Sequence, residues 1–375
     1  MNLPILRRYF ILASGVLLGM GLLLAACAPG GPRVVRCDLH GREYVELYSE
    51  HFGTALPDDW SFDGKWEIVE TDDNSALYIE GMGAAVYKPG AWGEQPFIYS
   101  FKILKLARGF SANFLDSAEA ENYPLYSLVV KEGPGYVDEA PIGLILSLQK
   151  LSPSSAPQVL ASSDNLSYDS NKTYQIDIDY DRGKIQVYYY PDDPSTSQIQ
   201  QPVLVATDAE PITSGTISYV SRKDTTLLLD DIQVCGQPYV LSGTVYDLAG
   251  KAVPGIRVRV YGSGRSYSED PNRVEELNSE ATDQQGTFKV EAPPGYTYYL
   301  LHVEDQPGYK VYKAESAYGE IYDDTWIEHK SPMDEATSSN NIFYLEEIPT
   351  ETVSTTLPPD LLPPKSWRSQ PPLRL

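Results

Sequence analysis

Short stretches of alternating apolar and polar residues recur along residues 43–236. Glycine, proline, asparagine and aspartate separate them, and examples are SALYIEG, FIYSFKI, PLYSLVV, IGLILSLQK, TYQIDIDY, KIQVYYY, GTISYVS and TLLLDDIQVC. Alternation with a period of two is typical of strands, and many short strands at this spacing indicate a sandwich or barrel. No long stretch has the periodicity of an amphipathic helix. The sequence therefore predicts an all-β domain here.

A second region of alternation covers residues 237–347. Ile256, Val258 and Val260 alternate with Arg257 and Arg259, so this strand has one face for a core. The turn DQQGTF and the stretch PPG fall where hairpins need glycine and proline, and NNIFYLEE is the predicted last strand. A smaller β-sandwich is therefore expected after the first.

Strand 174–181 carries aspartates at alternate positions. Its apolar residues share one face, while Asp177, Asp179 and Asp181 share the other. A two-residue turn at 182–183 predicts the cross-strand pairs Asp181 with Lys184, Tyr180 with Ile185, Asp179 with Gln186 and Ile178 with Val187. The apolar pairs fix the core face, and the aspartates are predicted to lie on a solvated outer face.

The order of these strands, from DDWSFDGKWEIVE through TYQIDIDYDRGKIQVYY to TLLLDDIQVC, resembles the concanavalin A-like lectin/glucanase superfamily in its laminin-G-like jelly-roll form. The resemblance implies either sugar binding or hydrolysis. Laminarinase-like members carry Glu-x-Asp-x-Glu on such a strand, whereas this chain has Gln175 at the position of the nucleophile. An inverting pair of Asp177 and Asp179, about 7 Å apart along the strand, is the catalytic alternative.

The second region, with VLSGTVYDLAGKAVPGIRVRVYG and ATDQQGTFKVEAPPGYTYYLLHVEDQPGY, resembles the carboxypeptidase regulatory-like domain, a small prealbumin-like (Ig-like) sandwich. That resemblance implies a module without catalytic residues of its own, which usually accompanies other extracellular modules.

The first residues predict export and a lipid anchor. Arg7 and Arg8 precede an apolar run that ends in LLAAC, which resembles the lipobox of bacterial lipoproteins. Residues 1–26 would be the signal peptide, Cys27 the site of lipid attachment and 27–42 a tether on the outer side of a membrane of the bacterial cell envelope. An uncleaved anchor helix is the alternative. Residues 348–375 are rich in proline and predict a disordered tail.

Two further cysteines bracket the first domain, and two other residues are candidates for a site. We expect Cys37 and Cys235 to form a disulfide, with two free thiols as the alternative. Asp230 shares a strand face with apolar residues, so it is a candidate for a structural calcium site or for a buried, hydrogen-bonded carboxylate. Trp60 and Trp66 are expected in the core, and Trp92, in the loop PGAWGEQP, is the candidate for an exposed ligand contact.

The composition excludes some classes of function. A formal net charge of -23 argues against nucleic acid as a partner, because such binding needs clustered cations. The four histidines are far apart in sequence, and neither a Ser-nucleophile elbow nor a phosphate loop is present. The sequence favours a non-catalytic lipoprotein that binds carbohydrate or protein; a polysaccharide hydrolase and a structural spacer are the alternatives.

Overall fold

The computed structural model describes residues 34–71, 75–88, 92–116, 124–137, 140–141, 143–192, 201–333 and 335–348. Cys27 and all but the first residue of the proline-rich tail lie outside these ranges, so the predicted lipid anchor and tail stay predictions. Within them, no helix is long and apolar enough to cross a membrane.

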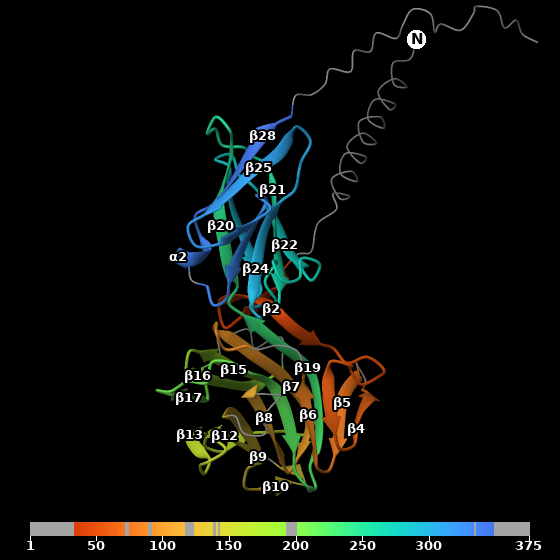
Figure 1. Ribbon diagram of the computed structural model, residues 1–375. Helices are drawn as coiled ribbons and strands as arrows, with labels where there is room; N and C mark the ends of the chain where they lie inside the picture. Colours follow the sequence, from red (N-terminus) through yellow and green to blue (C-terminus); the bar gives the residue numbers. More distant parts are fainter. Residues whose placement is uncertain are drawn as a thin grey trace, which may run out of the picture.

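The first domain is a jelly-roll sandwich of two large antiparallel sheets (Figure 1). One sheet has the order β1 (Arg36–Leu39), β2 (Arg42–Glu50), β19 (Thr226–Gly236), β7 (Phe97–Ala107), β15 (Tyr174–Asp181), β16 (Lys184–Pro191) and β17 (Leu204–Thr207). Off this path, β5 (Ser75–Glu80) pairs with β19, and β4 (Trp66–Glu70) pairs with β5. The other has the order β13 (Gln158–Ser162), β12 (Gly143–Leu151), β9 (Leu125–Glu132), β8 (Gly109–Asp116), β18 (Thr216–Ser221), β6 (Gly83–Tyr87) and β3 (Trp60–Asp63), with β14 (Leu166–Ser167) beside β12. A short ladder joins β10 (Tyr136–Val137) and β11 (Ala140–Pro141).

The inward faces of these sheets form one aromatic-rich core. Each stretch for which the alternation predicted a strand is a strand, and the β15–β16 register matches the predicted pairs residue for residue. Ile176 and Ile178 are fully buried, and Trp60 and Trp66 lie in the core as expected. The period of two therefore fixed the inward face correctly.

The chain enters the first domain earlier than predicted. Residues 36–50 form the β1–β2 hairpin. Residues 43–50 were correctly assigned to the domain, whereas residues 36–42 were assigned to the tether. His40 and Gly41 make its two-residue turn with φ of 53° and 73°, the left-handed conformation that such hairpin turns require. The tether prediction was wrong over residues 36–42 because this short strand is stabilised by distant partners.

A disulfide between Cys37 and Cys235, with an S–S distance of 2.21 Å, joins this hairpin to the last strand of the domain. The bond spans β2, which lies between β1 and β19 in the sheet. Cys37 and Tyr44 pack with Cys235 and with Ile98, which is fully buried on β7. The hairpin therefore folds back over the outer face of its own sheet.

The second domain is a smaller sandwich. One sheet has the order β23 (Thr287–Ala292), β20 (Tyr239–Asp247), β28 (Asn341–Glu347) and β25 (Tyr309–Ser316), and the other β22 (Glu275–Ala281), β21 (Arg257–Ser263), β24 (Tyr298–Val303), β27 (Trp326–Lys330) and β26 (Glu320–Tyr322). A single helical turn, α2 (Glu335–Ser338), precedes β28. Ile256, Val258 and Val260 are buried and Arg257 is exposed, as the alternation predicted.

A short connection joins the two sandwiches. Only Gln237 and Pro238 separate β19 from β20, and the Gln237 amide donates a hydrogen bond to Pro96 O at 2.8 Å. Across the junction, Arg36 and Glu291 form an ion pair at 2.6 Å. We call this junction the seam.

Candidate functional site

The aspartates of β15 were predicted to be solvated, and for Asp177 and Asp179 this prediction was wrong. The side chain of Asp177 is 0% exposed and that of Asp179 is 2% exposed, whereas that of Asp181 is 40% exposed. The face was assigned correctly as the outer one, but the β1–β2 hairpin covers it. The tip of that hairpin places His40 and Arg42 directly over the two carboxylates.

Four side chains surround the Asp177 carboxylate. His40 Nε2 lies 2.8 Å from Oδ2, and Tyr190 OH donates to the same oxygen at 2.5 Å. Ser100 Oγ donates to Oδ1 at 2.5 Å, and Gln175 Nε2 donates to it at 2.9 Å. Burial alone would raise the pKa of Asp177, but these hydrogen bonds hold it below its usual value.

Asp179 has a poorer environment two residues along the same strand. Arg42 Nη2 lies 3.0 Å from its Oδ2, while its buried Oδ1 has no hydrogen-bond partner among the described residues. Burial raises the pKa of Asp179 above its usual value, and the Arg42 charge offsets this only in part.

The His40 ring also closes the space above these groups. It stacks on the Tyr188 ring with centroids 3.8 Å apart and lies edge-on to Tyr190. A glycosidase needs its carboxylates open to the scissile bond and, for inversion, room for a water between them. With Asp177 enclosed by four partners, the arrangement has the character of a structural network that fixes the hairpin to the sheet.

Asp230 is buried, at 6% exposure, as its position on the strand suggested. Its Oδ1 accepts a hydrogen bond from the Asp231 amide at 2.8 Å, and Asp231 is in turn paired with His51 and Lys102. Burial raises the pKa of Asp230 above its usual value. No group of three or more acidic, histidine or cysteine side chains suited to a metal occurs among the described residues. The calcium assignment at Asp230 stays a prediction, with the hydrogen-bonded carboxylate as the arrangement that the contacts support.

Trp92 is not an exposed ligand contact. It is 6% exposed, its ring stacks on Tyr87 with centroids 5.4 Å apart, and its backbone pairs with Gly215 in an isolated bridge. The glycines and prolines beside it indicated a protruding loop, but this bridge holds the loop against the sandwich. One edge of Trp92 nevertheless lines a pocket.

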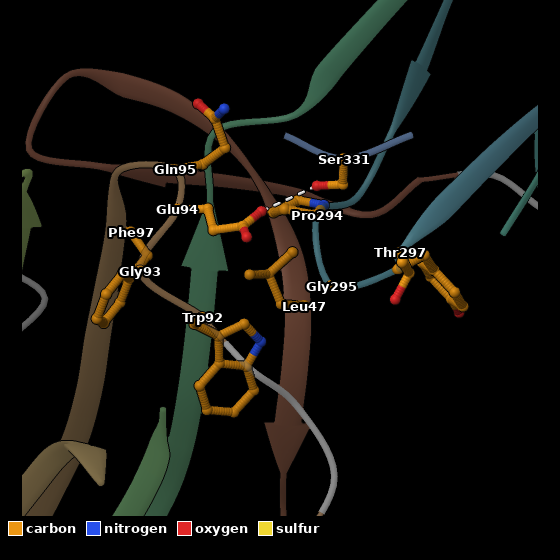
Figure 2. A pocket seen from close by; sticks show the side chains of 11 residues that line it. Leu47, Trp92, Gly93, Glu94, Gln95, Phe97, Pro294, Gly295, Thr297 and Ser331 are labelled. Carbon is orange, nitrogen blue, oxygen red and sulfur yellow. Dashed lines mark hydrogen bonds between the residues drawn. The ribbon is translucent and has the colours of Figure 1, made fainter. Parts of the chain in front are cut away.

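That pocket lies at the seam and takes its lining from both domains (Figure 2). Its volume is about 120 Å³. The lining residues are Leu47, Trp92, Gly93, Glu94, Gln95, Phe97, Pro294, Gly295, Tyr296, Thr297 and Ser331. Aromatic edges, a carboxylate, an amide and hydroxyls thus meet in one small space.

A second, larger pocket of about 510 Å³ lies along the same seam. It is lined by Gln95, Arg182, Gln237, Pro238, Tyr239, Val240, Ser242, Lys289, Met333 and Ser338. Its volume falls in the range of about 300–1,000 Å³ that is usual for ligand sites. Gln95 lines both pockets, so they are neighbours along the junction.

Polar contacts hold the two walls of the seam together. Ser331 Oγ donates to Glu94 Oε2 at 2.9 Å, the bond drawn in Figure 2, and lies 3.1 Å from the Tyr239 hydroxyl. The amide of Gln95, by contrast, has no hydrogen-bond partner among the described residues. Gln95 lines both pockets, so a ligand at the seam would find an amide donor and acceptor that no described residue occupies.

Sequence reasoning missed the seam. Glu94 and Gln95 follow Trp92 in the loop that was predicted to carry a ligand contact. The opposite wall of the pocket comes from loops about 200 residues later in the chain. Gly236, at the end of β19, gave a local signal: a Cβ there would lie 2.7 Å from Leu47 Cδ1 and 3.3 Å from Pro294 Cγ, so a side chain would press on the junction.

No family model matches this sequence, and no curated protein matches it. Several solved structures resemble about half of the chain. The carbohydrate-binding module CBM66 from Bacillus subtilis has 17% identity over 48% of this chain and 96% of that chain, with a TM-score of 0.35. A protein of unknown function with a galectin-like fold from Bacillus subtilis has 15% identity over 52% of this chain and 99% of that chain, with a TM-score of 0.37. The exoplasmic/lumenal domain of VIP36, in a Ca²⁺/Man3GlcNAc-bound form, has 10% identity over 50% of this chain and 87% of that chain, with a TM-score of 0.35. At these identities and TM-scores, the likenesses assign neither a family nor a function to this chain.

Proposed function

We propose that this protein is a lipid-anchored component of the bacterial cell envelope that binds carbohydrate, without turnover, at the seam between its two sandwiches. The anchor is proposed at Cys27. Fatty-acid labelling that disappears in Cys27→Ala would support it, and unchanged labelling would contradict it.

The observation that carries the proposal is the free amide of Gln95 between two pockets with mixed lining. A sugar ring presents an apolar face and a rim of hydroxyls, so it needs aromatic surface and hydrogen-bonding groups side by side. Tyr296, which is half-buried, supplies aromatic surface, and Glu94, Gln95 and Thr297 supply the hydrogen-bonding groups. The connection between the domains is also short and polar contacts hold the seam together, so ligand binding would not carry the entropic cost of ordering the site.

A polysaccharide hydrolase acting through Asp177 and Asp179 is the less favoured function. The enclosure of Asp177 by His40, Ser100 and Tyr190 argues for a structural carboxylate. A turnover assay on every bound glycan separates the two functions, because a hydrolase must release reducing ends.

The test of the seam uses substitutions at exposed or half-exposed positions. Gln95→Ala removes the amide shared by both pockets, and Glu94→Gln removes the charge but keeps an oxygen for Ser331. Gln284→Ala, on an exposed turn of the second domain, is the matched control. A lost hydrogen bond to a neutral group is worth about 0.5–1.5 kcal/mol and one to a charged group about 1.5–3 kcal/mol.

We therefore expect Gln95→Ala to weaken glycan affinity several-fold and Glu94→Gln about tenfold or more, with Gln284→Ala unchanged in titration calorimetry. Equal affinity in all four proteins would place the site elsewhere. Trp92→Ala is unsuitable, because Trp92 is part of the core and its loss would disturb the fold.

A further inference from the structure

A cluster of cations lies at the end of the first sandwich that points away from the second. Arg108 in the β7–β8 turn, Lys131 on β9, and Arg222 and Lys223 in the β18–β19 turn line a shallow pocket of about 320 Å³, together with Gly109, Val130 and Glu132. β7 runs from the seam to this end, and its 11 residues span roughly 35 Å at about 3.3 Å each. The pocket is therefore separate from the seam (Figure 1).

None of these cations forms an ion pair among the described residues. All four side chains are exposed, and none lies within 4.0 Å of a carboxylate oxygen in the described parts of the chain. Asp224 follows Lys223 in the turn without pairing with it. Such a grouping is unexpected in a chain with a net charge of -23, since most of its surface supplies carboxylates. Like charges placed together cost stability, and a bound anion would remove that cost.

The two turns that carry the cations are locked to each other. Thr225 is fully buried, and its hydroxyl donates to Gly109 O at 2.7 Å and accepts from the Arg222 amide at 3.2 Å. At Gly109 a Cβ would lie 2.4 Å from Val130 O, so a side chain does not fit there. The spacing between the cationic turns is thus built into the fold.

Arg108 is held in a conformation that is uncommon for its residue type. Its φ is 74°, in the left-handed region that costs energy for a residue with a Cβ. Glu132 keeps it there: the Arg108 amide donates to Glu132 Oε1 at 2.7 Å, and the Glu132 amide donates to Arg108 O at 3.3 Å. The strained backbone places the guanidinium beside the pocket.

We propose that this pocket binds a tetrahedral oxyanion, a phosphate or sulfate ester carried on an envelope or extracellular glycan. Arginine presents a planar fork that matches such oxyanions with two parallel hydrogen bonds, and lysine adds point charges. The pocket of about 320 Å³ takes one ester group at a time, so ligands that share this ester are distinguished by the glycan or polyol that carries it. The pocket does not depend on the seam, and either site can fail without the other.

The test compares the full chain with Arg222→Gln/Lys223→Gln. The control is Lys172→Gln/Lys251→Gln, which changes two exposed lysines elsewhere and gives the same net charge. Binding is measured by titration calorimetry at two salt concentrations with poly(glycerol phosphate), dextran sulfate, neutral dextran and single-stranded DNA. Melting temperatures check that all three proteins are folded.

We expect saturable, salt-sensitive binding of poly(glycerol phosphate) or dextran sulfate, weakened tenfold or more in the pocket variant and less than twofold in the control. The tighter of the two polymers identifies the ester. Equal weakening in both variants would mean a general charge effect and would overturn the proposal. No binding by the parent, or DNA bound as tightly as either polymer, would overturn it as well.

Discussion

Asp177 and Asp179 occupy adjacent outward positions of one strand, yet their neutralisation should have different consequences. In Asp177→Asn, the new NH₂ group must face either the Ser100 and Gln175 side or the His40 and Tyr190 side. The two donors on that side then lose their acceptor, and the other two keep a neutral one. Hydrogen bonds to charged groups are worth about 1.5–3 kcal/mol each, and reorientation of the hydroxyls recovers part of this. We expect the first sandwich to lose about 3 kcal/mol.

Asp179→Asn is the matched comparison. It removes a buried charge whose pKa is raised and whose Oδ1 has no partner among the described residues, and it weakens one pairing with Arg42, which also contacts Tyr44. The gain from relieved burial and the loss of the pairing oppose each other. We therefore expect a change within about 1 kcal/mol.

The assay is a guanidinium titration of the oxidised protein, with hydrogen exchange of peptides covering residues 174–191 to isolate the first sandwich. The sign with pH follows from the pKa of Asp177, which is lowered in the folded state. Its contribution is present above the unfolded value of about 3.9 and is lost as the pH falls through the folded value. A shift below about 0.5 kcal/mol for Asp177→Asn, or a larger loss for Asp179→Asn, would refute the network described above.

Three further predictions concern the cysteines, His302 and Asp230. Cys37→Ser/Cys235→Ser should lose about 2–5 kcal/mol in the same titration, because the bond closes a loop with a sequence separation of 198 residues; an unchanged midpoint would contradict this. Burial lowers the pKa of His302 to about 4, so the second sandwich should lose stability as the pH falls from about 6.5 to 4. His302→Gln should remove this pH dependence of the melting temperature, and a dependence that persists in the variant would assign it to another group. Calcium should leave the melting temperature unchanged, given the contacts of Asp230; a rise that disappears in Asp230→Ala would instead establish the calcium site.

Alternation along the chain was enough to predict which residues face the cores. Ile178 and Val187 pair across β15 and β16 as expected, because a period of two and a two-residue turn leave no freedom in register. The alternation does not predict whether another segment of the chain covers the outer face of a sheet. The burial of Asp177 depends on His40, which lies 137 residues earlier and makes its contact through a hairpin turn.

The candidate site could not be predicted for a related reason. The lining of the seam combines Glu94 and Gln95 with Pro294 and Ser331, and no local pattern links loops that belong to different domains. The loop around Trp92 does line the pocket, but the predicted role of Trp92 was wrong. Its ring packs in the core, and the residues that follow it form the pocket wall.

Carbohydrate binding at the seam can be tested with a glycan and polysaccharide array probed with the full chain and with Gln95→Ala, followed by product analysis on each hit. We expect saturable binding by the parent, weaker binding by the variant and no released reducing ends. Release of reducing ends, or hits that Gln95→Ala leaves unchanged, would contradict non-catalytic binding at the seam.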